Sequence, residues 1–361
     1  MKKKIEQRKS NKNILIIGPT PPPVGGVAVY VDRLYNLLKQ NYNVKLLTYH
    51  LLDGNRFFNK LKLMKIIIQS LRFQPDIIYS NMTDRYLMPF LILLNRIRGV
   101  KVIQHIHSYR VEQHNLIKKS LIFTSTLLST IVVVPSKALI ETLNRVYKKN
   151  LNLKKIFVVP SYLSTKYSSV LHKTTKILPS EVENFFSTHN PVIVANAYKI
   201  VLINNKDIYG IKDSVLLLEE IRKHFPNAGL IFFLPNIGEY NYFQLLNKLL
   251  KAKRLSKHFI WVTDPVLFLN VLKRSTLFIR PTLTDSYGIS ITEALELGVP
   301  AVASDICERA KGTVLYKTGS FKDLLKKTKQ VLEKIEYYRY KVKKSHTSDS
   351  SEDIINLIES L

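Results

Sequence analysis

Residues 278–305 read Phe278-Ile-Arg-Pro-Thr-Leu-Thr-Asp285-Ser-Tyr-Gly288-Ile-Ser-Ile-Thr-Glu293-Ala-Leu-Glu-Leu-Gly298-Val-Pro300-Ala-Val-Ala-Ser-Asp305. The stretch begins with a short apolar strand and ends with a second one, from Pro300 to Ala303. Between them, a turn-rich loop leads into a short helix over Ile291–Leu297, which Gly298 and Pro300 end. Open α/β folds bind ligands at the carboxyl edge of the sheet. This strand–loop–helix–strand unit therefore predicts a ligand site in its loop.

Two carboxylates lie eight residues apart in this unit, Asp285 in the loop and Glu293 in the first turn of the predicted helix. Gly288 lets the backbone approach a ligand closely, and the free amides from Ile289 to Thr292 form a positive helix end that suits a phosphate. Carboxylates beside an anion site fit neutral hydroxyls, such as those of a ribose and a hexose. Ordinary acids favoured by the helix dipole are the alternative, and the two residues alone leave both interpretations open.

The whole stretch resembles the donor-sugar motif of the family 4 retaining glycosyltransferases, which have the GT-B fold. That motif is an acid, seven residues and then Glu-Ala, followed by a small-residue turn and a Pro-led strand. It matches Asp285 and Glu293-Ala294 here, with the turn and the strand in residues 297–305. The family usually has Glu at the first position, where this chain has the shorter Asp285.

The resemblance implies roles for these residues. Glu293 would hold the ribose and Asp285 the sugar hydroxyls, while the amides of Gly288, Ile289 and Ser290 would stabilise the departing diphosphate. A sugar would move from a nucleoside diphosphate donor to an acceptor hydroxyl with retained anomeric configuration, by same-face attack assisted by the leaving phosphate. No metal and no cofactor is expected, because GT-B enzymes use helix amides and basic side chains where other transferases use a metal.

The composition describes a soluble two-domain protein. A length of 361 residues suits two domains of ordinary size, and 46% hydrophobic residues can fill two cores. The single cysteine, Cys307, excludes an intramolecular disulfide and a cysteine-cluster zinc site, which fits a reducing cytoplasm. A net charge of +28 implies an anionic partner, which can be nucleic acid, a membrane surface or a phosphorylated substrate. No zinc finger or RNP-like motif is present, so nucleic acid is not the expected partner.

The N-terminal half begins with a strand at Ile14–Ile17, an apolar run too short for a signal-peptide core or a membrane span. A loop ending in Gly25 and Gly26 then leads into a helix. The Gly-x-Gly-x-x-Gly pattern is absent, so a dinucleotide site is not expected. In the resembled family a Gly-Gly pair at this place faces the cleft between the domains, which marks Gly25 and Gly26 as substrate-binding. A plain flexible turn is the alternative.

A later strand, Lys101–Ile106, delivers two histidines to its end. Alternation turns His105 and His107 to the same side of the sheet, with His107 nearer the strand's terminus. A His-x-His pair can bind metal, but no third ligand follows nearby, so zinc is not expected. In family 4 enzymes a histidine at the end of this strand lies beside the donor sugar, and His107 fits that position. A core histidine is the alternative.

Residues 56–73 predict a basic amphipathic helix, in which apolar residues alternate with Lys60, Lys62, Lys65 and Arg72. Such a helix can lie on an anionic bilayer, and a plain surface helix is the alternative. The resemblance extends to basic family members of bacterial surface-polysaccharide and capsule pathways. It implies a lipid-linked glycan as acceptor and a cytoplasmic protein, peripheral on the inner face of the cell membrane.

The second half offers lysines for the donor diphosphate. Family 4 enzymes usually have an Arg after the first strand of this domain and a Lys several residues later, and both clamp the diphosphate. Lys199 fits the first position with Lys in place of Arg. Lys206 is preferred to Lys212 for the second, although the usual Lys-Gly pair reads Tyr209-Gly here. Solvated surface lysines are the alternative. Thr263, after the strand with the only tryptophan, should border the nucleotide base.

The expected fold is α/β of the GT-B type, with two Rossmann-like parallel-sheet domains facing a central cleft. Residues 1–165 are expected to form the acceptor-side domain and residues 166–345 the nucleotide-sugar-binding domain, with a C-terminal helix over 346–361 that can cross back to the first. Two other functions share this fold. A catalytically silent partner subunit would fit Asp285 and Tyr209. A non-hydrolysing nucleotide-sugar epimerase would need more acid and histidine groups for proton transfer.

Overall fold

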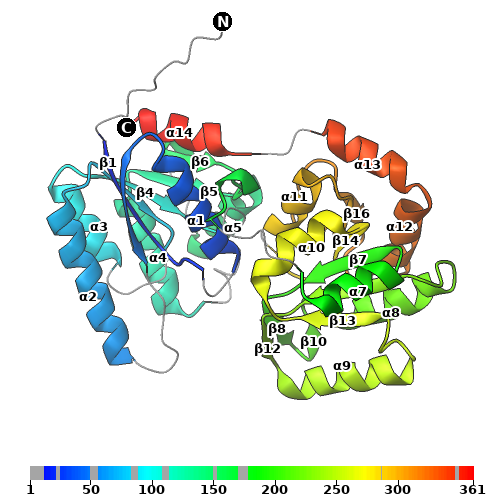
Figure 1. Cartoon of the computed structure of the whole chain (residues 1–361). Helices are drawn as coiled ribbons and strands as arrows, with labels where there is room; N and C mark the ends of the chain where they lie inside the picture. The colour runs from blue at the N-terminus through cyan, green and yellow to red at the C-terminus, as the bar shows by residue number, and fades with distance from the viewer. Residues whose placement is uncertain are drawn as a thin grey trace, which may run out of the picture. The chain divides into compact units, whose positions relative to one another are not determined.

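The computed structural model describes residues 12–21, 25–48, 56–82, 88–107, 114–148, 153–169, 178–285, 287–345 and 349–361, with the backbone alone at 56–60, 62, 63 and 153. The chain divides into two compact units (Figure 1). Unit 1 is made of Met1–Ser169 and Asp349–Leu361, and unit 2 of Val170–Ser348. Residues 346–348, at the start of the predicted C-terminal segment, lie outside the described residues.

Unit 1 contains a six-stranded parallel sheet with the order β2-β1-β3-β4-β5-β6. The four inner strands are short and almost wholly buried, as expected for a parallel sheet covered on both faces. The strands are β1 (Asn13–Gly18), β2 (Asn43–Thr48), β3 (Ile77–Ser80), β4 (Lys101–His105), β5 (Ile131–Val134) and β6 (Ile156–Val158).

Helices follow most of these strands. They are α1 (Gly26–Leu38), α2 (Arg56–Phe73), α3 (Met88–Ile97), α4 (Leu116–Leu128) and α5 (Lys137–Tyr147), with short 3₁₀ turns η2 (Leu153–Lys155) and η3 (Thr165–Tyr167). The predicted helix over 56–73 is found with the bounds expected. α2 and α3 cover the same face of the sheet, because Ile66 of α2 and Leu91 of α3 share one apolar cluster with Ile78 of β3.

The last helix, α14 (Ser351–Glu359), belongs to unit 1. It is the red helix of Figure 1. Lys12 Nζ donates a hydrogen bond to the carbonyl oxygen of Ile358 at 3.0 Å, and the Tyr42 hydroxyl donates to the Glu359 carboxylate. At its start, Ser350 N donates to the carbonyl oxygen of Tyr162 at 3.1 Å. The C-terminal helix is therefore fixed to unit 1 at both of its ends.

Unit 2 contains a second six-stranded parallel sheet, with the order β13-β11-β7-β14-β15-β16. Two small two-stranded ribbons, β8–β12 and β9–β10, accompany it. The strands are β7 (Val192–Asn196), β8 (Lys199–Ile200), β9 (Leu202–Ile203), β10 (Lys206–Asp207), β11 (Gly229–Phe233), β12 (Asn236–Gly238), β13 (Phe259–Val262), β14 (Leu277–Arg280), β15 (Ala301–Ser304) and β16 (Val314–Tyr316).

The helices of unit 2 are α7 (Ser180–Thr188), α8 (Ile211–Arg222), α9 (Tyr240–Ala252), α10 (Phe268–Arg274), α11 (Ile289–Glu296), α12 (Phe321–Glu333) and α13 (Ile335–Lys344), with one 3₁₀ turn η4 (Pro265–Leu267). The pattern of residues 321–338 predicts one continuous helix, and this is wrong. The backbone leaves the helical region at Lys334, with φ −120° and ψ 39°, so α12 ends there and α13 begins. Among the helices that the structure describes, none is long and apolar enough to span a membrane.

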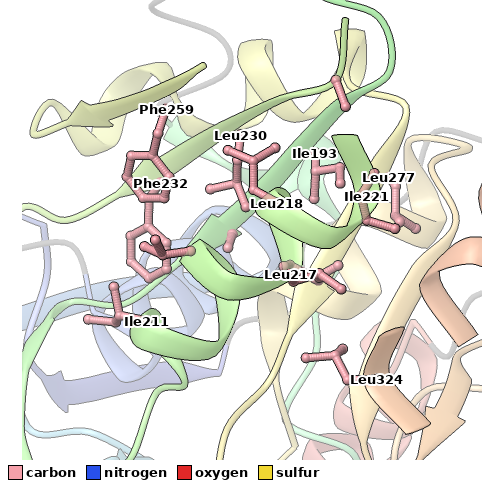
Figure 2. Packing of buried hydrophobic residues seen from close by; sticks show 14 of the residues in the cluster. Ile193, Ile211, Leu217, Leu218, Ile221, Leu230, Phe232, Phe259, Leu277 and Leu324 are labelled. Atoms are coloured by element: carbon pink, nitrogen blue, oxygen red, sulfur yellow. The ribbon is translucent and has the colours of Figure 1, made fainter. Parts of the chain in front are cut away.

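The core of unit 2 lies between its sheet and the helices α8 and α12 (Figure 2). Leu217, Leu218 and Ile221 of α8 are fully buried against the sheet, where Leu230 and Phe232 meet them. Each such side chain contributes about 1.5–3 kcal/mol by leaving water. This packing holds the carboxyl ends of the strands in fixed positions, from which the loops extend.

Strand order reverses direction once in each sheet. In unit 1 the reversal lies between β1 and β3, and in unit 2 between β7 and β14. At such a switch point the connections leave to opposite faces and open a crevice outside the carboxyl ends of the strands, which is where open α/β sheets bind ligands. The two switch points are therefore the expected ligand sites of the two units.

Candidate active site

The switch point of unit 2 is bridged by two side chains. Asn196 ends β7 and Arg280 ends the neighbouring β14. Arg280 Nη1 donates a hydrogen bond to Asn196 Oδ1 at 2.9 Å and to the Asn196 carbonyl oxygen at 3.3 Å. A charged residue thus stands at the place where the fold predicts a ligand.

The Asp285 carboxylate is shared by two arginines. Arg280 Nε and Arg309 Nη1 each donate to Asp285 Oδ2 at 2.8 Å. The three side chains are buried, with 10% of Asp285, 12% of Arg280 and 1% of Arg309 exposed. Burial by itself would raise the pKa of Asp285, but the guanidinium of Arg280 and then that of Arg309 outweigh it and hold the pKa well below its usual range. Asp285 is therefore an ionised counter-ion of two buried cations.

Arg309 ties two loops together. Its Nε donates to the Ser304 carbonyl oxygen at 3.0 Å, and its Nη2 donates to Ser304 Oγ at 3.1 Å and to Thr282 Oγ1 at 3.3 Å. Its Nη1 also reaches the carbonyl oxygen of Tyr287 at 3.3 Å. The loop after β15 is thereby bound to the loop between β14 and α11, and the path of that loop is fixed.

Gly288 precedes α11 in a conformation that suits glycine alone. Its φ is +82°, and a Cβ at this position would lie 2.8 Å from Arg309 Nη1 and 3.2 Å from Asp285 Oδ2. Gly288 has no side chain to occupy the free amides of the first turn, which include those of Ile289 and Ser290. The uncapped helix start that the sequence predicts is therefore present, and Arg309 lies beside it.

The N-terminus of α8 is different. Asp207 accepts hydrogen bonds from the backbone amides of Tyr209 at 2.9 Å, Lys212 at 3.2 Å and Ile211. These bonds satisfy the orphan amides of that helix with a protein carboxylate. The helix start that follows Lys206 is therefore already occupied, and α11 is the better candidate for a diphosphate.

Glu293 lies deeper than the sequence predicts. The helix begins at Ile289, so Glu293 is in its second turn rather than its first. An acid in the first turn of a helix is expected to face solvent, and for Glu293 this is wrong, because only 5% of it is exposed. A carboxylate buried this far is costly unless it is bonded, and Glu293 does interact with another group of the protein.

The remaining predicted residues of unit 2 lie on its surface. Lys199 begins β8, Lys206 begins β10 and Thr263 follows β13, and all three are exposed. No hydrogen bond joins them to Asp285 or Arg280 among the residues that the structure describes. Their exposure leaves them accessible to a ligand, but the contacts of the unit alone do not gather them into one site.

His105 and His107 form a stacked pair in unit 1. Their ring centroids are 3.8 Å apart with an angle of 19° between the planes, so both rings lie on one side of the sheet as the alternation predicts. The Tyr30 ring of α1 meets both edge-on, with its centroid 4.8 Å from that of His105 and 5.0 Å from that of His107. The pair lies at the carboxyl edge of the sheet, beside its switch point.

Hydrogen bonds link this pair into a chain of six polar groups. The Tyr30 and Tyr79 hydroxyls are 3.2 Å apart, and the Tyr79 hydroxyl lies 3.1 Å from His105 Nδ1. Ser161 Oγ lies 3.0 Å from His105 Nε2 and 3.2 Å from His107 Nδ1. The chain ends at Asn81, whose Oδ1 is 2.9 Å from His107 Nε2.

Burial governs the titration of this cluster. It raises the pKa of Tyr30 and of Tyr79 well above the ordinary tyrosine value. Burial, aided by the neighbouring His107, lowers the pKa of His105 well below the ordinary value, and burial lowers the pKa of His107 to about 3. Both imidazoles are therefore neutral at physiological pH.

The glycine pair predicted to bind substrate stands at the start of α1. Gly25 is the N-cap residue with φ −118°, a value that any residue can adopt, and Gly26 is the first residue of the helix. A Cβ on Gly25 would meet no described atom within 4 Å. Gly18, at the end of β1, is the more constrained glycine, since its Cβ would lie 2.8 Å from Val31 and 3.1 Å from the Asn81 side chain.

Several residues of these clusters were not predicted from the sequence. Arg280 had a signal, since it is a charged residue directly after a buried strand and within the quoted motif. The other four had no sequence signal, because they reach their partners only through strand order. They are Arg309, Asn196, Ser161 and Asn81. Among the described residues, no group of three or more His, Cys, Asp or Glu is placed to hold a metal ion.

Residues 198–338 match a family model described as "Glycosyl transferases group 1". This segment contains Lys199, Asp285, Gly288 and Glu293. No curated protein sequence matches the chain.

The fold is similar to that of several solved structures. Anabaena Alr3699/HepE in complex with UDP-glucose aligns with a TM-score of 0.69 at 13% identity, over 97% of this chain and 100% of that one. Sucrose-phosphate synthase from Thermosynechococcus elongatus aligns with a TM-score of 0.67 at 13% identity, over 97% of this chain and 99% of that one. An alpha,alpha-trehalose-phosphate synthase (UDP-forming) from Burkholderia vietnamiensis aligns with a TM-score of 0.66 at 10% identity, over 98% of this chain and 99% of that one. At these identities the likeness shows the fold.

The fold is therefore that of the GT-B glycosyltransferases, as the sequence predicts: an α/β chain with two Rossmann-like parallel sheets. This fold and the group 1 glycosyltransferase match in residues 198–338 together support glycosyltransferase activity for the chain.

Proposed function

We propose that the protein is a retaining glycosyltransferase that moves a sugar from a nucleoside diphosphate sugar to a hydroxyl of a lipid-linked glycan in surface-polysaccharide biosynthesis. The bond between the sugar C1 and the diphosphate oxygen breaks, and the acceptor oxygen bonds to C1 on the same face. The acceptor's proton passes to the leaving phosphate. The family match of residues 198–338 supports the donor class, as does the fold shared with a protein solved in complex with UDP-glucose.

One observation carries this proposal. The first-turn amides of α11 are not capped by a side chain, and Arg309, which shares Asp285 with Arg280, lies beside Gly288 at the start of the helix. Free amides and fixed guanidiniums stabilise the charge that develops on a departing diphosphate, and they need no reorganisation when it leaves. At the α8 N-terminus, Asp207 already accepts hydrogen bonds from the amides of Ile211 and Lys212.

The other residues take roles around this centre. Glu293 holds the ribose hydroxyls, and the exposed Lys199 and Lys206 neutralise the diphosphate. Thr263 contacts the base. Asp285, predicted to face the sugar hydroxyls, also holds the two arginines in place, so its loss removes more than one interaction.

His107 of unit 1 contacts the transferred sugar, and Gly25 and Gly26 let the substrate approach the backbone at the start of α1. The open space at the Gly25 Cβ position supports this role, since no described atom competes for it.

The proposal is tested by screening UDP-, GDP- and ADP-sugars for thermal stabilisation, followed by proton NMR of the product formed with a lipid-linked acceptor. We expect one nucleotide series to raise Tm in proportion to the logarithm of its concentration, and a product with the donor's anomeric configuration. A silent partner subunit would bind donor without turnover, and an epimerase would change the donor without any acceptor. If no nucleotide sugar raises Tm, the donor site does not exist.

We also propose that unit 1 docks on an anionic membrane surface. Two neighbouring helices each expose an apolar stripe at i, i+3 and i+7 spacing, which is one side of a helix. The stripes are Leu61, Met64 and Ile68 on α2, and Phe90, Leu93 and Ile97 on α3. Single exposed apolar residues are ordinary, but two parallel stripes are typical of an interaction surface.

Charge supports lipid as the occupant of these stripes. The sequences of α2 and α3 contain no acidic residue, and Lys65 and Arg72 of α2 and Arg96 of α3 supply positive charge. Each basic group near an anionic bilayer contributes on the order of 1 kcal/mol, and the apolar stripes add burial at the headgroup boundary. A lipid-linked acceptor would be reached from this position, on the inner face of the cell membrane.

A further inference from the structure

The hydrogen-bonded chain in unit 1 fixes where its protons are. Its members are Tyr30, Tyr79, His105, Ser161, His107 and Asn81, in that order. Each internal link joins two groups that can both donate and accept, so no single bond reveals its direction. The bond at the end of the chain does reveal its direction. The atom of Asn81 that faces His107 is an amide oxygen, which can only accept.

The assignment starts at that oxygen. Because Asn81 Oδ1 accepts, the hydrogen of the 2.9 Å bond belongs to His107 Nε2. His107 is neutral, so its Nδ1 has no hydrogen and must accept the hydroxyl hydrogen of Ser161 across 3.2 Å. Ser161 has then given its only hydrogen, and its oxygen accepts from His105 Nε2 across 3.0 Å.

The directions of the remaining hydrogen bonds, toward Tyr79 and Tyr30, follow in the same way. His105 carries its hydrogen on Nε2, so its Nδ1 accepts from the Tyr79 hydroxyl at 3.1 Å. The Tyr79 oxygen in turn accepts from the Tyr30 hydroxyl at 3.2 Å. One proton arrangement therefore satisfies every link, and both histidines are the tautomer with hydrogen on Nε2.

We propose that Tyr79, His105 and Ser161 are positioning residues that lock His107 as the neutral Nε2–H tautomer. A second proton on His107 would place Nδ1–H against the Ser161 oxygen. That oxygen already accepts from His105, and the Ser161 hydrogen would lose its acceptor. His107 is thereby restricted to donating one hydrogen bond from Nε2, and it is excluded from general acid or base chemistry near neutral pH.

The fixed tautomer of His107 affects the proposed reaction through the contact proposed between His107 and the sugar, so this part of the inference rests on the proposed function. In the structure the Nε2 hydrogen of His107 is given to Asn81 Oδ1, so a sugar hydroxyl oxygen that accepts this hydrogen takes the place of that amide oxygen. An imidazole that exchanges between its two neutral tautomers would present a donor at Nε2 in one and an acceptor in the other. The buried chain removes this choice before the ligand arrives.

The tautomer is measured directly by ¹⁵N NMR of the full chain with ¹⁵N-labelled histidine, with the His107 signals assigned by their loss in His107→Gln. We expect a protonated Nε2 and an unprotonated Nδ1 on His107, unchanged from pH 8 to pH 5.5. The ionisable groups whose rings contact His107 are His105 and Tyr30, and both are uncharged in this range. A signal with hydrogen on Nδ1, or a titration near pH 6.5, would overturn the proposal.

Variants separate positioning from simple stability. Ser161→Ala removes the link between the histidines, and we expect a mixture of His107 tautomers with an increase in donor KM of about tenfold. Ser161→Thr keeps the hydroxyl and should restore the single tautomer. Ser129→Ala is the matched control, since Ser129 is an equally buried hydroxyl that bonds Gln104 and Ser125 instead.

The tautomer of His107 and its contact with the sugar are tested separately by these variants. If Ser161→Ala leaves the His107 tautomer as in the wild type, the chain does not position His107 and the inference is wrong. If the tautomer becomes mixed while KM is unchanged, the inference about the chain holds and the proposed sugar contact of His107 fails. The NMR measurement needs no turnover, so it decides the first question even in an inactive preparation.

Discussion

Arg309 Nη1 lies 2.8 Å from Asp285 Oδ2 and joins a guanidinium in the loop after β15 to a carboxylate in the loop after β14. The same oxygen accepts from Arg280 Nε at 2.8 Å, so one acid is the shared counter-ion of two buried cations. A motif read from the sequence gives Asp285 a role toward the ligand. The structure adds a role toward the protein, because the loop that carries Gly288 is held by these bonds.

Asp285→Asn should therefore destabilise the protein strongly. The amide keeps the shape of the carboxylate but leaves two buried guanidiniums without a counter-charge, which costs about 3–5 kcal/mol. Glu183→Gln is the matched control, because Glu183 pairs with Arg274 at 2.7 Å on the surface and should change stability by less than about 1 kcal/mol. Urea unfolding of both variants measures the difference. Equal, small losses would show that the cluster is held by other interactions.

Stability should fall as the solution becomes acidic, through the buried histidine pair. Burial lowers the pKa of His107 from 6.5 to about 3 and lowers that of His105 as well, so unfolded chains bind protons that the folded chain does not. The free energy of unfolding is therefore highest above pH 6.5. It declines as pH falls from 6.5 toward 3, by about 1.4 kcal/mol per pH unit for each histidine. The free energy of unfolding measured between pH 7.5 and pH 5 reports it.

The control for that slope uses two histidine variants. His105→Gln should remove the contribution of one proton from the slope of the unfolding free energy against pH. This holds even if the variant is less stable overall. His224→Gln, at an exposed histidine of unit 2, should leave the slope as in the wild type. A slope that is the same in all three proteins would mean that the pair titrates normally.

Activity should not depend on a divalent metal. Helix amides and arginines take the place of a metal in the proposed site, and no Asp-x-Asp pair occurs in the sequence. Turnover measured after treatment with EDTA should match the untreated rate. Loss of turnover that manganese or magnesium restores would mean that the diphosphate is held in another way.

The protein should adsorb to anionic membranes in a salt-sensitive manner. Exposed charges are screened by salt, so cosedimentation with phosphatidylserine vesicles should be strong at low salt and weak at high salt, with little binding to phosphatidylcholine. Replacing Lys60, Lys62 and Lys65 with Glu should reduce binding far more than the same change at Lys248, Lys251 and Lys257 of unit 2. Phe90→Ser with Ile97→Ser on α3 should weaken binding at every salt concentration. Equal binding by both triple variants would mean that the charge acts diffusely.

The sequence predicts the architecture well and the site only in part. Apolar runs and helix stops locate most strands and helices, because those signals are local: α2 has the bounds expected. Alternation likewise predicts that His105 and His107 share a side, and the stacked rings confirm it. The α12–α13 break carried no comparable signal, since no Pro or Gly marks Lys334.

Partners from distant strands could not be read from the sequence. Ser161 meets His105 because β6 follows β5 in the sheet, and Arg280 meets Asn196 because β14 lies beside β7. Strand order is a property of the whole fold, and no spacing in the sequence encodes it. The burial of Glu293 was missed for a smaller reason, a helix that begins at Ile289 instead of Ile291.

Unit 2 is proposed to bind a nucleoside diphosphate sugar through Glu293 and the start of α11. The most direct test of this binding is calorimetric titration of nucleotide sugars into the wild type, Glu293→Gln and the control Glu296→Gln, with release of nucleoside diphosphate measured in parallel. A charge-assisted hydrogen bond contributes about 1.5–3 kcal/mol, so Glu293→Gln should bind the donor about 10- to 100-fold more weakly and turn over more slowly, while Glu296→Gln behaves as the wild type. Donor binding and nucleotide release by Glu293→Gln at the wild-type level would contradict the account.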